Sequence, residues 1–336
     1  MKITMYGTRG SSPVADENKR RFGGNTTCVA VDSNCLPSDM VFNIDGGSGF
    51  LPYGGMLAAH VAFQKRIGKF EPIELVCGLT HYHWDHIQGL PLAAPMFMKS
   101  DFNIHLLGPV DNNVGPDEMM YSMMKAPFFP VSFEAISSHV TATPIIRPSD
   151  QVLLIHPKGR LMPVDLPTFE KAERLNTPIN FGARGSYFLN ECLVIKMLRS
   201  NHPEQTISYR FEERPTGRVF VFLTDHEVTA AIPSDLRRHV TGAHVLVQDA
   251  QYLEERYQHA TCGFGHGTGA YCVRVAKECG VRVLGLTHHD PMASDAAVDE
   301  VVAEAMAEAM EIFPAEDGKV LAPTIFACSD YQVIGV

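Results

Sequence analysis

The first third of the chain alternates short apolar runs with glycine-rich turns, a pattern that is typical of β-strands. A longer stretch, residues 50–67, spaces its apolar positions as a helix does. Strands and helices are therefore expected to follow one another in this part of the sequence. The strands predicted here cover residues 2–6, 27–31, 40–44, 73–79 and 102–107.

The same alternation resumes near residue 186 and continues towards the end of the chain. A helix is predicted over residues 268–279, closed by Gly280, and another over 294–313, begun by a Ser-Asp cap. No low-complexity linker or composition break separates the two parts, which predicts a single domain over residues 1–336. The strands predicted in this part cover 186–189, 192–198, 206–211, 218–223, 244–248, 281–286 and, as the last strand of the chain, 324–328.

Between these two parts the pattern loosens, and residues of about 111–183 form a predicted insertion. The insertion contains a Met- and Phe-rich stretch, residues 119–130, that has no consistent periodicity. Such a stretch can act as a lid, as the contact of a homodimer or as ordinary core packing, because methionine fills gaps in cores and also forms adaptable binding surfaces. The sequence leaves these alternatives open.

Composition narrows the class of partner. The formal net charge is -10 over 336 residues, so the chain lacks the Lys and Arg surplus that attracts nucleic acid or anionic lipid, and a small substrate fits better. The N-terminal residues lack the apolar segment of a secretory signal, and no apolar run is long enough to span a membrane, which predicts a cytoplasmic protein. The eight cysteines contain no C-x-x-C pair and suggest neither a zinc ribbon nor a disulfide framework.

The sequence THYHWDHIQG, residues 80–89, carries the clearest chemical signal, because three histidines and an aspartate follow directly on a predicted strand. Alternation along an extended backbone points His81 and His83 to one side. Asp85 and His86, where the chain turns, can face a second point. Histidine and carboxylate ligands suit zinc and similar first-row ions, so two adjacent divalent metal ions are predicted.

Further candidate ligands follow other predicted strands. Asp225 comes after strand 218–223, His288 after strand 281–286, and His202 shortly after strand 192–198. Ligands at strand ends lie on rigid elements, and one edge of a sheet can gather them although they are distant in sequence. Adjacent histidines compete for two of these positions, since His226 follows Asp225 and His289 follows His288; Asp225 and His288 are favoured.

Five motifs, NIDGGSG, HYHWDH, NHP, FLTD and LTHHD, occur in an order that resembles the metallo-β-lactamase superfamily. The resemblance implies an α/β fold, a four-layer αββα sandwich of two mixed sheets between outer helices, with a dinuclear metal site at one edge. It implies that Asp225 bridges both ions and that Asp45 lies behind the ligands and orients one of them. The implied ligands are His81, His83 and His202 for the first ion and Asp85, His86 and His288 for the second.

The subfamily is indicated by residues 265–291, GHGTGAYCVRVAKECGVRVLGLTHHDP, which resemble ribonuclease Z and its cyclic phosphodiesterase relatives. The patterns of lactamases, flavo-diiron proteins and glyoxalase II are not matched. Gly267 replaces the usual serine of the related motif. The opening GTRGSSP with GGNTTC is also similar to the glycine-rich start of these enzymes, which places Asn25 and Thr26 in the predicted substrate pocket.

His266 lies just before the predicted helix 268–279, whose N-terminal N–H groups and dipole form a seat for a phosphate. From there it can donate a proton to a leaving oxygen or stabilise charge on the phosphoryl group. The hydroxyl of Thr268 is a predicted substrate contact. The alternative is that His266 only neighbours the helix cap and takes no part in chemistry.

Together these residues predict a metal-dependent phosphodiesterase with two ions, preferably zinc, although manganese or iron also suits the ligands. A hydroxide between the ions, oriented by Asp85 or Asp225, is the expected nucleophile. Only residues 203–224 separate His202 from Asp225, too few for the RNA-gripping arm of long-armed ribonuclease Z, which favours a small cyclic phosphodiester. Two alternatives remain, a ribonuclease Z-like RNA endonuclease and a non-catalytic, metal-containing nucleotide sensor.

Overall fold

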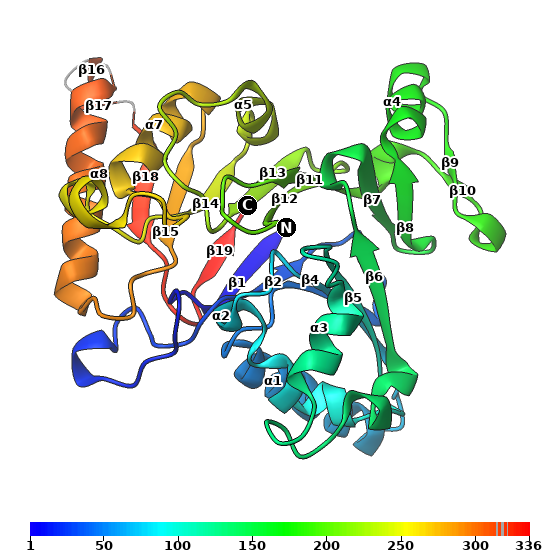
Figure 1. Cartoon of the computed structure of the whole chain (residues 1–336). Helices are drawn as coiled ribbons and strands as arrows, with labels where there is room; N and C mark the ends of the chain where they lie inside the picture. The colour runs from blue at the N-terminus through cyan, green and yellow to red at the C-terminus, as the bar shows by residue number, and fades with distance from the viewer. Residues whose placement is uncertain (314, 317–318, 321) are drawn as a thin grey trace.

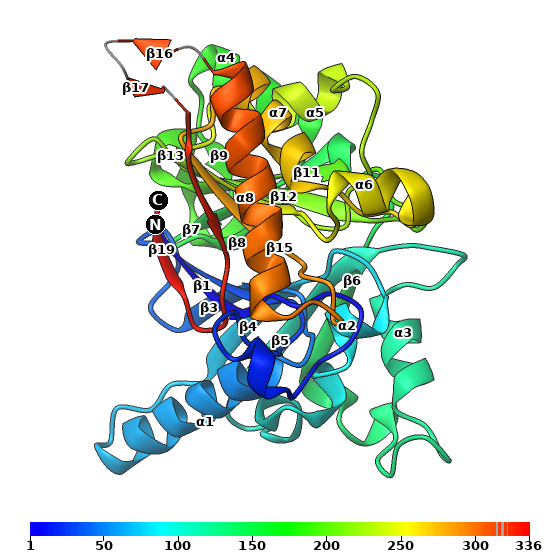
Figure 2. The ribbon, with the colours of Figure 1, turned by 90° about the vertical axis from the view of Figure 1, so that its left-hand side faces the viewer.

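The computed structural model describes residues 1–313, 315–316, 319–320 and 322–336. Within these residues two large β-sheets pack face to face, and helices cover the outer face of each sheet (Figure 1). Both chain termini lie close together beside the sheets (Figures 1 and 2). This is the predicted α/β arrangement of four layers, and the prediction of the fold class is confirmed.

The first sheet is mixed and contains seven strands in the order β19-β1-β2-β3-β4-β5-β6. Neighbouring strands from β19 to β3 run antiparallel, and those from β3 to β6 run parallel. The strands are β1 (Lys2–Gly7), β2 (Cys28–Asp32), β3 (Met40–Ile44), β4 (Ile73–Gly78), β5 (Phe102–Pro109), β6 (Val140–Ile145) and β19 (Val333–Gly335).

The second sheet is also mixed and has the order β18-β15-β14-β13-β12-β11-β7-β8. Strands β13, β14, β15 and β18 run parallel, whereas the strands from β8 to β13 are antiparallel. The strands are β7 (Gln151–His156), β8 (Arg160–Asp165), β11 (Leu193–Arg199), β12 (Ile207–Glu213), β13 (Arg218–Leu223), β14 (Val245–Asp249), β15 (Val283–Thr287) and β18 (Thr324–Ala327). Short pairs are formed by β9 (Ile179–Asn180) with β10 (Ser186–Tyr187) and by β16 (Ala315–Glu316) with β17 (Lys319–Val320).

Helices close the sandwich on both sides. Helix α1 packs on the first sheet, and helices α5, α7 and α8 pack on the second, with α7 against α8 (Figure 2). No helix among the described residues is long and apolar enough to cross a membrane. The helices are α1 (Phe50–Arg66), α2 (Trp84–Ile87), α3 (Pro116–Met123), α4 (Leu166–Leu175), α5 (Ser234–Val240), α6 (Glu254–Arg256), α7 (Gly269–Cys279) and α8 (Asp295–Ile312).

The core between the two sheets consists of aliphatic and aromatic side chains. Contacts across this core connect the two sheets near the loop that carries the histidine cluster. Phe42 of β3 packs on Phe211 of β12 with ring centroids 5.4 Å apart, so an aromatic contact joins the two sheets. The hydroxyl of Tyr209 donates a hydrogen bond of 2.9 Å to the carbonyl of Leu79, at the end of β4. This bond fixes the loop that carries the histidine cluster to the second sheet.

Two predictions about the ends of the sheets need correction. The strand over 324–328 is not the last one, because β19 follows it and pairs antiparallel with β1. The predicted strand 186–189 shortens to Ser186–Tyr187, which pairs only with β9. Both misses involve very short edge strands, where pairing rather than sequence pattern decides the conformation.

The predicted insertion region contains α3, β6, and the hairpin of β7 and β8 followed by α4, which projects from the molecule in Figure 1. The Met-rich half of residues 119–130 is core packing, since Met119, Met120 and Met123 are buried against the first sheet. Phe128 in the second half is 80% exposed. The homodimer contact stays a prediction.

Candidate metal centre

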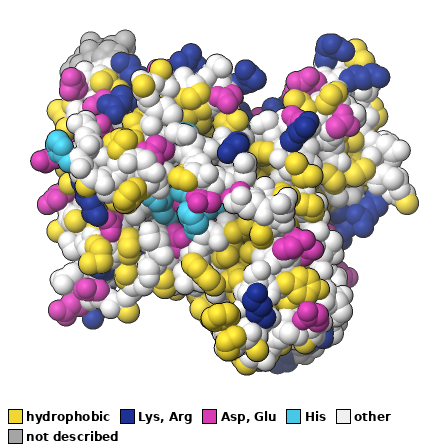
Figure 3. Space-filling model, viewed as in Figure 1, with side chains coloured by type: hydrophobic (Ala, Val, Ile, Leu, Met, Phe, Trp, Pro, Cys, Tyr) yellow, Lys and Arg dark blue, Asp and Glu magenta, His cyan; other side chains and the backbone are white. Residues whose placement is uncertain are grey.

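The candidate metal centre lies where strands of both sheets end. Asp45 follows β3, Asp225 follows β13 and His288 follows β15, and all three have positive φ, at 59°, 49° and 61°. Left-handed backbone at a non-glycine residue costs on the order of 1–3 kcal/mol and persists where the surrounding structure requires it. The strain turns each side chain out of its strand direction towards a common point. Figure 3 shows histidine side chains reaching the surface near the centre of this face, with acidic side chains beside them.

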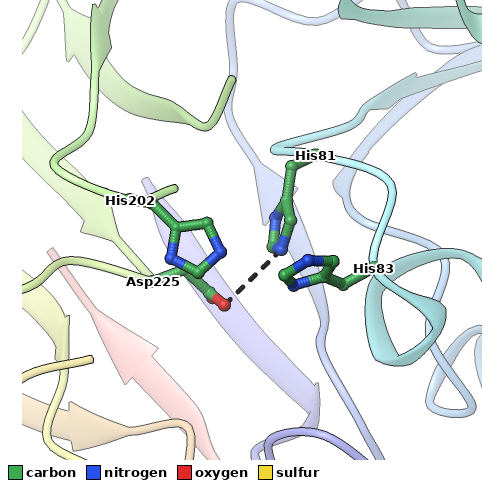
Figure 4. Close-up of side chains that lie close together, drawn as sticks. All are labelled: His81, His83, His202 and Asp225. Atoms are coloured by element: carbon green, nitrogen blue, oxygen red, sulfur yellow. Dashed lines mark ion pairs between the residues drawn. The ribbon is translucent and has the colours of Figure 1, made fainter. Parts of the chain in front are cut away.

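The first group of side chains comprises His81, His83, His202 and Asp225. Each offers one ligand atom, and these atoms all lie within 4.8 Å of one another. Figure 4 shows the four side chains converging from the loop after β4, the loop after β11 and the end of β13. Nε2 of His81 lies 3.5 Å from Oδ2 of Asp225. The alternation predicted for His81 and His83 therefore brings both to the same group.

The second group comprises Asp85, His86 and His288. Oδ2 of Asp85 lies 3.1 Å from Nε2 of His288 and 3.3 Å from Nε2 of His86. Asp225 touches this group through its other oxygen, Oδ1, which lies 3.3 Å from Nε2 of His86 and 3.4 Å from Nε2 of His288. One carboxylate thus faces both groups, one oxygen to each.

The ring nitrogens of the buried histidines are arranged for ligation. In each of four imidazoles Nδ1 is engaged in a hydrogen bond, which leaves Nε2 directed towards the centre. The hydrogen-bond partner of Nδ1 fixes the orientation of each imidazole ring. The pairs are His81 with the hydroxyl of Thr80, His86 with Asp45, His202 with the carbonyl of Gly265, and His288 with Oε1 of Gln251.

Buried polar atoms without partners test whether these residues fit a metal. Nε2 of His81, Nε2 of His202 and Oδ2 of Asp225 are buried and have no hydrogen-bond partner among the described residues. A buried polar atom left unpaired costs about 1–3 kcal/mol, so three at one point require a common explanation. Bonds of about 2.0–2.2 Å at tetrahedral angles separate ligand atoms by about 3.3–3.6 Å. The oxygens of Asp225 lie 3.3–3.5 Å from Nε2 of His81, His86 and His288, so the residues fit divalent metal ions.

The electrostatics of the site favour an ionised Asp225 and neutral imidazoles at His81 and His202, whereas at His86 the opposing effect of burial is outweighed by Asp225, Asp85 and Asp45, which raise its pKa well above its usual value. Burial would raise the pKa of Asp225, but His288, His86 and His81 outweigh it and hold that pKa well below its usual value. Burial lowers the pKa of His81 well below its usual value and also lowers that of His202. Deprotonated carboxylates and neutral imidazoles are the forms that bind metal ions.

Asp45 is placed to orient His86. It is fully buried, and its Oδ2 accepts from Nδ1 of His86 at 2.7 Å and from the hydroxyl of Thr80 at 2.9 Å, while Oδ1 accepts from the Thr80 N–H at 2.7 Å. Thr80 in turn contacts Nδ1 of His81. One carboxylate therefore contacts His86 directly and His81 through Thr80, and its role behind the metal ligands stays a prediction.

We expect Asp45→Asn to lower metal affinity by about 10- to 100-fold, because an amide cannot accept all three of these hydrogen bonds. The measurement is competition with a chelator, followed by elemental analysis of the retained metal. Asp32→Asn is the matched control, since the Asp32 side chain is 65% exposed and pairs with Lys2 at the surface. Equal retention in both variants would contradict the role of Asp45.

The two competing histidines lie outside the ligand groups. His226 bonds through Nδ1 with Ser200 and through Nε2 with the hydroxyl of Tyr271. Nε2 of His289 donates to the carbonyl of Cys328 at 2.8 Å. Burial lowers the pKa of each to about 4, so both imidazoles are neutral structural residues. The neighbours favoured in the sequence, Asp225 and His288, are the ones in the cluster.

His266 lies beside the second group, and its ring stacks on that of His288 with centroids 4.9 Å apart. Nδ1 of His266 donates to Oδ2 of Asp249 at 2.9 Å. Burial would lower the pKa of His266, but Asp249 outweighs it, with help from Asp225 and Asp85, and raises that pKa to about 9. The imidazole is therefore held in its protonated, proton-donating form.

Asp249 was missed in the sequence, although it follows the predicted strand 244–248 as Asp225 follows 218–223. Two further contacts were not visible in the pattern. Gln251 bonds His288, and the N–H of Ser11 donates to Oδ2 of Asp85 at 2.7 Å. These groups orient the predicted ligands from loops far away in sequence.

The loop before Ser11 also limits the space around His288. A Cβ at Gly10 would lie 2.5 Å from the imidazole ring of His288, closer than packing allows. Gly10→Ala should therefore displace His288 and lower the metal content of the second group, as elemental analysis would show. Gly55→Ala is the control, because nothing lies within 4 Å of the new methyl on helix α1. The displacement of His288 is refuted if both variants keep the metal content of the wild type.

Three predicted substrate contacts are engaged elsewhere. The hydroxyl of Thr26 accepts from the N–H of Ser48 and from Gln88, and Asn25 accepts from the Ser48 hydroxyl. Thr268 caps α7 by accepting from the Tyr271 N–H and donates its hydroxyl to Glu254. The contacts of these three residues are structural, so their role in binding substrate stays a prediction.

Gly267 occupies the position where the related motif usually has a serine, and the packing around it explains the glycine. A Cβ there would lie 2.7 Å from the carbonyl oxygen of Asp249 and 3.1 Å from that of His226. The close approach of these strand ends to the helix N-terminus leaves no room for a side chain. The glycine thus keeps His266 next to Asp249.

No family model matches the chain. Two curated relatives are both named ribonuclease Z. The protein of Brevibacillus brevis is 38% identical over 103 residues, which cover 31% of each chain. The protein of Saccharolobus islandicus is 24% identical over 247 residues, which cover 71% of this chain and 76% of the relative.

Solved structures cover almost the whole chain. The metallo-β-lactamase fold protein YhfI from Bacillus subtilis aligns with a TM-score of 0.57 and 17% identity over 99% of both chains. This chain has the metallo-β-lactamase fold. The short form of human tRNase Z aligns with a TM-score of 0.56 and 17% identity over 100% of this chain and 99% of that chain. A diphosphatase of the PhnP family aligns with a TM-score of 0.54 and 15% identity over 100% of this chain and 97% of that chain.

These comparisons confirm the resemblance found in the five motifs. The two curated relatives are named ribonuclease Z, and two of the structural neighbours are a tRNase Z and a diphosphatase of the PhnP family. The likeness extends over both sheets and the loops between them, so it includes every strand end that carries a candidate ligand.

Proposed function

We propose that this protein is a dinuclear metal-dependent phosphodiesterase that acts on a small phosphodiester. The observation that carries the proposal is the position of Asp225, whose two oxygens each face a separate group of ligand atoms 3.3–3.5 Å away. A carboxylate so placed is suited to bridge two ions. When bound, two such ions lower the pKa of a water between them towards about 7 and neutralise charge on the phosphate.

The residues of the chain then have separate tasks. Asp85 or Asp225 accepts a hydrogen bond from the hydroxide that remains when the attacking water loses a proton to solvent, and orients its oxygen towards phosphorus. A bond forms between that oxygen and phosphorus, the bond to the ester oxygen breaks with its electron pair, and Nε2 of His266 supplies the proton that the departing oxygen needs. Asp249 holds the His266 ring and keeps it protonated.

The substrate class is supported by the chain's charge and by the length of one loop. Strands β12 and β13 pair from Tyr209↔Phe222 to Glu213↔Arg218, so residues 203–224 form only a tight hairpin between His202 and Asp225. The formal net charge of -10 also disfavours a long polyanion. A cyclic nucleotide or a cyclic ribose phosphate satisfies both conditions.

RNA cleavage is the second candidate, and it is supported by one specific observation. Both curated relatives described above are named ribonuclease Z, and a human tRNase Z shares the fold over the whole chain. The earlier expectation that nucleic acid is not a partner therefore stays a prediction. Binding of metal without turnover, as in a nucleotide sensor, has no comparable support.

The test is a panel of substrates offered to the purified, metal-loaded protein. It contains bis(p-nitrophenyl) phosphate, cyclic nucleotides, a cyclic ribose phosphate, a precursor transfer RNA, a lactam and a thioester. We expect turnover of bis(p-nitrophenyl) phosphate and of a cyclic phosphodiester above that of the transfer RNA. Preferential cleavage of the transfer RNA would favour the second candidate, and turnover of only the lactam or thioester would reject both.

The metal is proposed to be zinc, with manganese or iron as alternatives. The first group offers three imidazoles and one carboxylate oxygen, a donor set that suits zinc well. The second group offers two imidazoles and the carboxylates of Asp85 and Asp225, and this larger share of oxygen also suits manganese or iron. Elemental analysis of the purified protein decides between them.

A further inference from the structure

Glu204 lies at the solvent side of the first ligand group, two residues after His202. Its Oε2 lies 3.2 Å from Nε2 of His83 and 3.3 Å from Nε2 of His202. His83 and His202 both belong to the first ligand group. The side chains of Glu204 and His83 are 41% and 43% exposed, whereas that of His202 is 1% exposed, so Glu204 meets the group from outside.

The loop that carries Glu204 is held at both ends. The N–H of Ser200 donates to the carbonyl of Thr206 at 2.8 Å, which closes the loop between β11 and β12. The N–H of Gln205 donates to Oδ2 of Asp111 at 3.3 Å, which ties the loop to the end of β5. Pro203 fixes φ directly before Glu204. The backbone position of Glu204 is therefore set by the fold.

The contact of Glu204 with His202 places two acceptors against each other. Nδ1 of His202 donates to the carbonyl of Gly265 at 3.0 Å, and a carbonyl only accepts, so Nε2 carries the lone pair of the neutral imidazole. That lone pair lies 3.3 Å from a carboxylate oxygen. Neither Nε2 of His202 nor Oε2 of Glu204 has a hydrogen-bond partner within the described ranges, and both atoms are buried. Two buried acceptors at this distance repel each other unless they share a cation.

We propose that Glu204 is an additional ligand of the first metal ion, on the side that faces solvent. The inference rests on the proposed dinuclear function and goes beyond it, because it adds a second carboxylate to the group of His81, His83, His202 and Asp225. Two consequences follow. The oxygen share of the first group rises, which increases its affinity for manganese or iron relative to zinc. A negative charge also stands where an anionic substrate must enter, so carboxylate and phosphate compete for this face.

The experiment compares Glu204→Gln and Glu204→Ala with the wild type as full-length, metal-loaded proteins. Metal retention is measured by chelator competition, and we expect it to fall at least about tenfold in Glu204→Ala and by a smaller factor in Glu204→Gln. Inorganic phosphate is the second probe, with metal supplied in excess. Its inhibition constant should fall several-fold in both variants, since the competing charge is gone.

The control is Glu170→Gln, which removes the same charge from an exposed residue of the remote helix α4 and should change neither quantity. Cobalt-substituted protein gives a readout independent of activity, because removal of a ligand lowers the coordination number and intensifies the visible absorption. Unchanged retention, phosphate inhibition and cobalt spectra in both variants would overturn the role of Glu204 alone. Wild-type protein that binds no metal would overturn the dinuclear function as well.

Discussion

Asp225→Asn should abolish turnover, with a fall in kcat/KM of roughly 10³-fold or more on bis(p-nitrophenyl) phosphate. Asp225 directs one oxygen to each ligand group, at 3.5 Å from His81 and at 3.3 and 3.4 Å from His86 and His288. Asparagine has nearly the same shape but only one acceptor oxygen and no charge. We therefore expect the metal content to fall from two equivalents to one or less.

Measuring metal content together with kcat/KM separates this effect from misfolding. Asp150→Asn is the matched control, because the Asp150 side chain is 62% exposed and pairs with Arg147 in a surface turn. The control should keep two ions and full activity. The bridging role of Asp225 would be refuted by an Asp225→Asn protein that retains two ions and stays within tenfold of wild-type activity.

His266→Ala should lower kcat by about 10²- to 10⁴-fold while leaving metal content unchanged, because general acid catalysis contributes on that scale. The loss depends on the leaving group. A cyclic nucleotide releases a poorly acidic alcohol and needs the proton, whereas p-nitrophenolate departs readily without it. The fall in kcat should thus be larger on the cyclic nucleotide than on bis(p-nitrophenyl) phosphate.

The dependence of kcat/KM on pH tests whether His266 acts as a proton donor. His266 donates only when it is protonated, so kcat/KM should decline as the pH rises through its pKa, which Asp249 raises to about 9. Bound metal cations oppose the rise in the pKa of His266. The decline of kcat/KM at alkaline pH, the alkaline limb, should therefore lie at or below about pH 9. Asp249→Asn removes the carboxylate and should move this limb to lower pH. A limb that stays in place would contradict the control of His266 by Asp249, and a loss of metal in His266→Ala would instead assign His266 to the metal ligands.

Much of the fold could be predicted because its elements carry local signals. Strand 40–44 matches β3, and the predicted helix 268–279 is α7 with Thr268 as its cap. Gly280 closes that helix in the left-handed conformation, at a φ of 67°. Ser294 caps α8 by accepting from the N–H of Ala297. In each case a few adjacent residues determine the structure.

The missed elements depend on distant partners. Strand β19 has three residues and exists because β1 offers an unpaired edge. Helix α4 begins at the Asp165 cap within the loosely patterned insertion, and its apolar residues Phe169 and Ala172 pack on β7 and β8. The start of α4 nevertheless carries a local signal that was missed in the sequence, because Asp165 caps the helix and Pro167 lies in its first turn.

The candidate site shows the same contrast between features with local sequence signals and features that depend on distant residues. The seven predicted ligands lie together because they follow strands that the sequence pattern predicts. Their role as ligands stays a prediction. Apart from Asp45, the groups that orient the histidines were not identified in the sequence. Asp249 and Gln251 contact histidines that lie 17 and 37 residues further along the chain, and Glu204 contacts His83, which precedes it by 121 residues. Only the packing of loops from both sheets creates these contacts.

The most direct test of the dinuclear centre is a titration of metal-free, full-length protein with a divalent metal while hydrolysis of bis(p-nitrophenyl) phosphate is followed. The account predicts that activity rises with added metal and reaches its plateau at two equivalents per chain. A plateau at one equivalent, or activity that needs no metal, would contradict it.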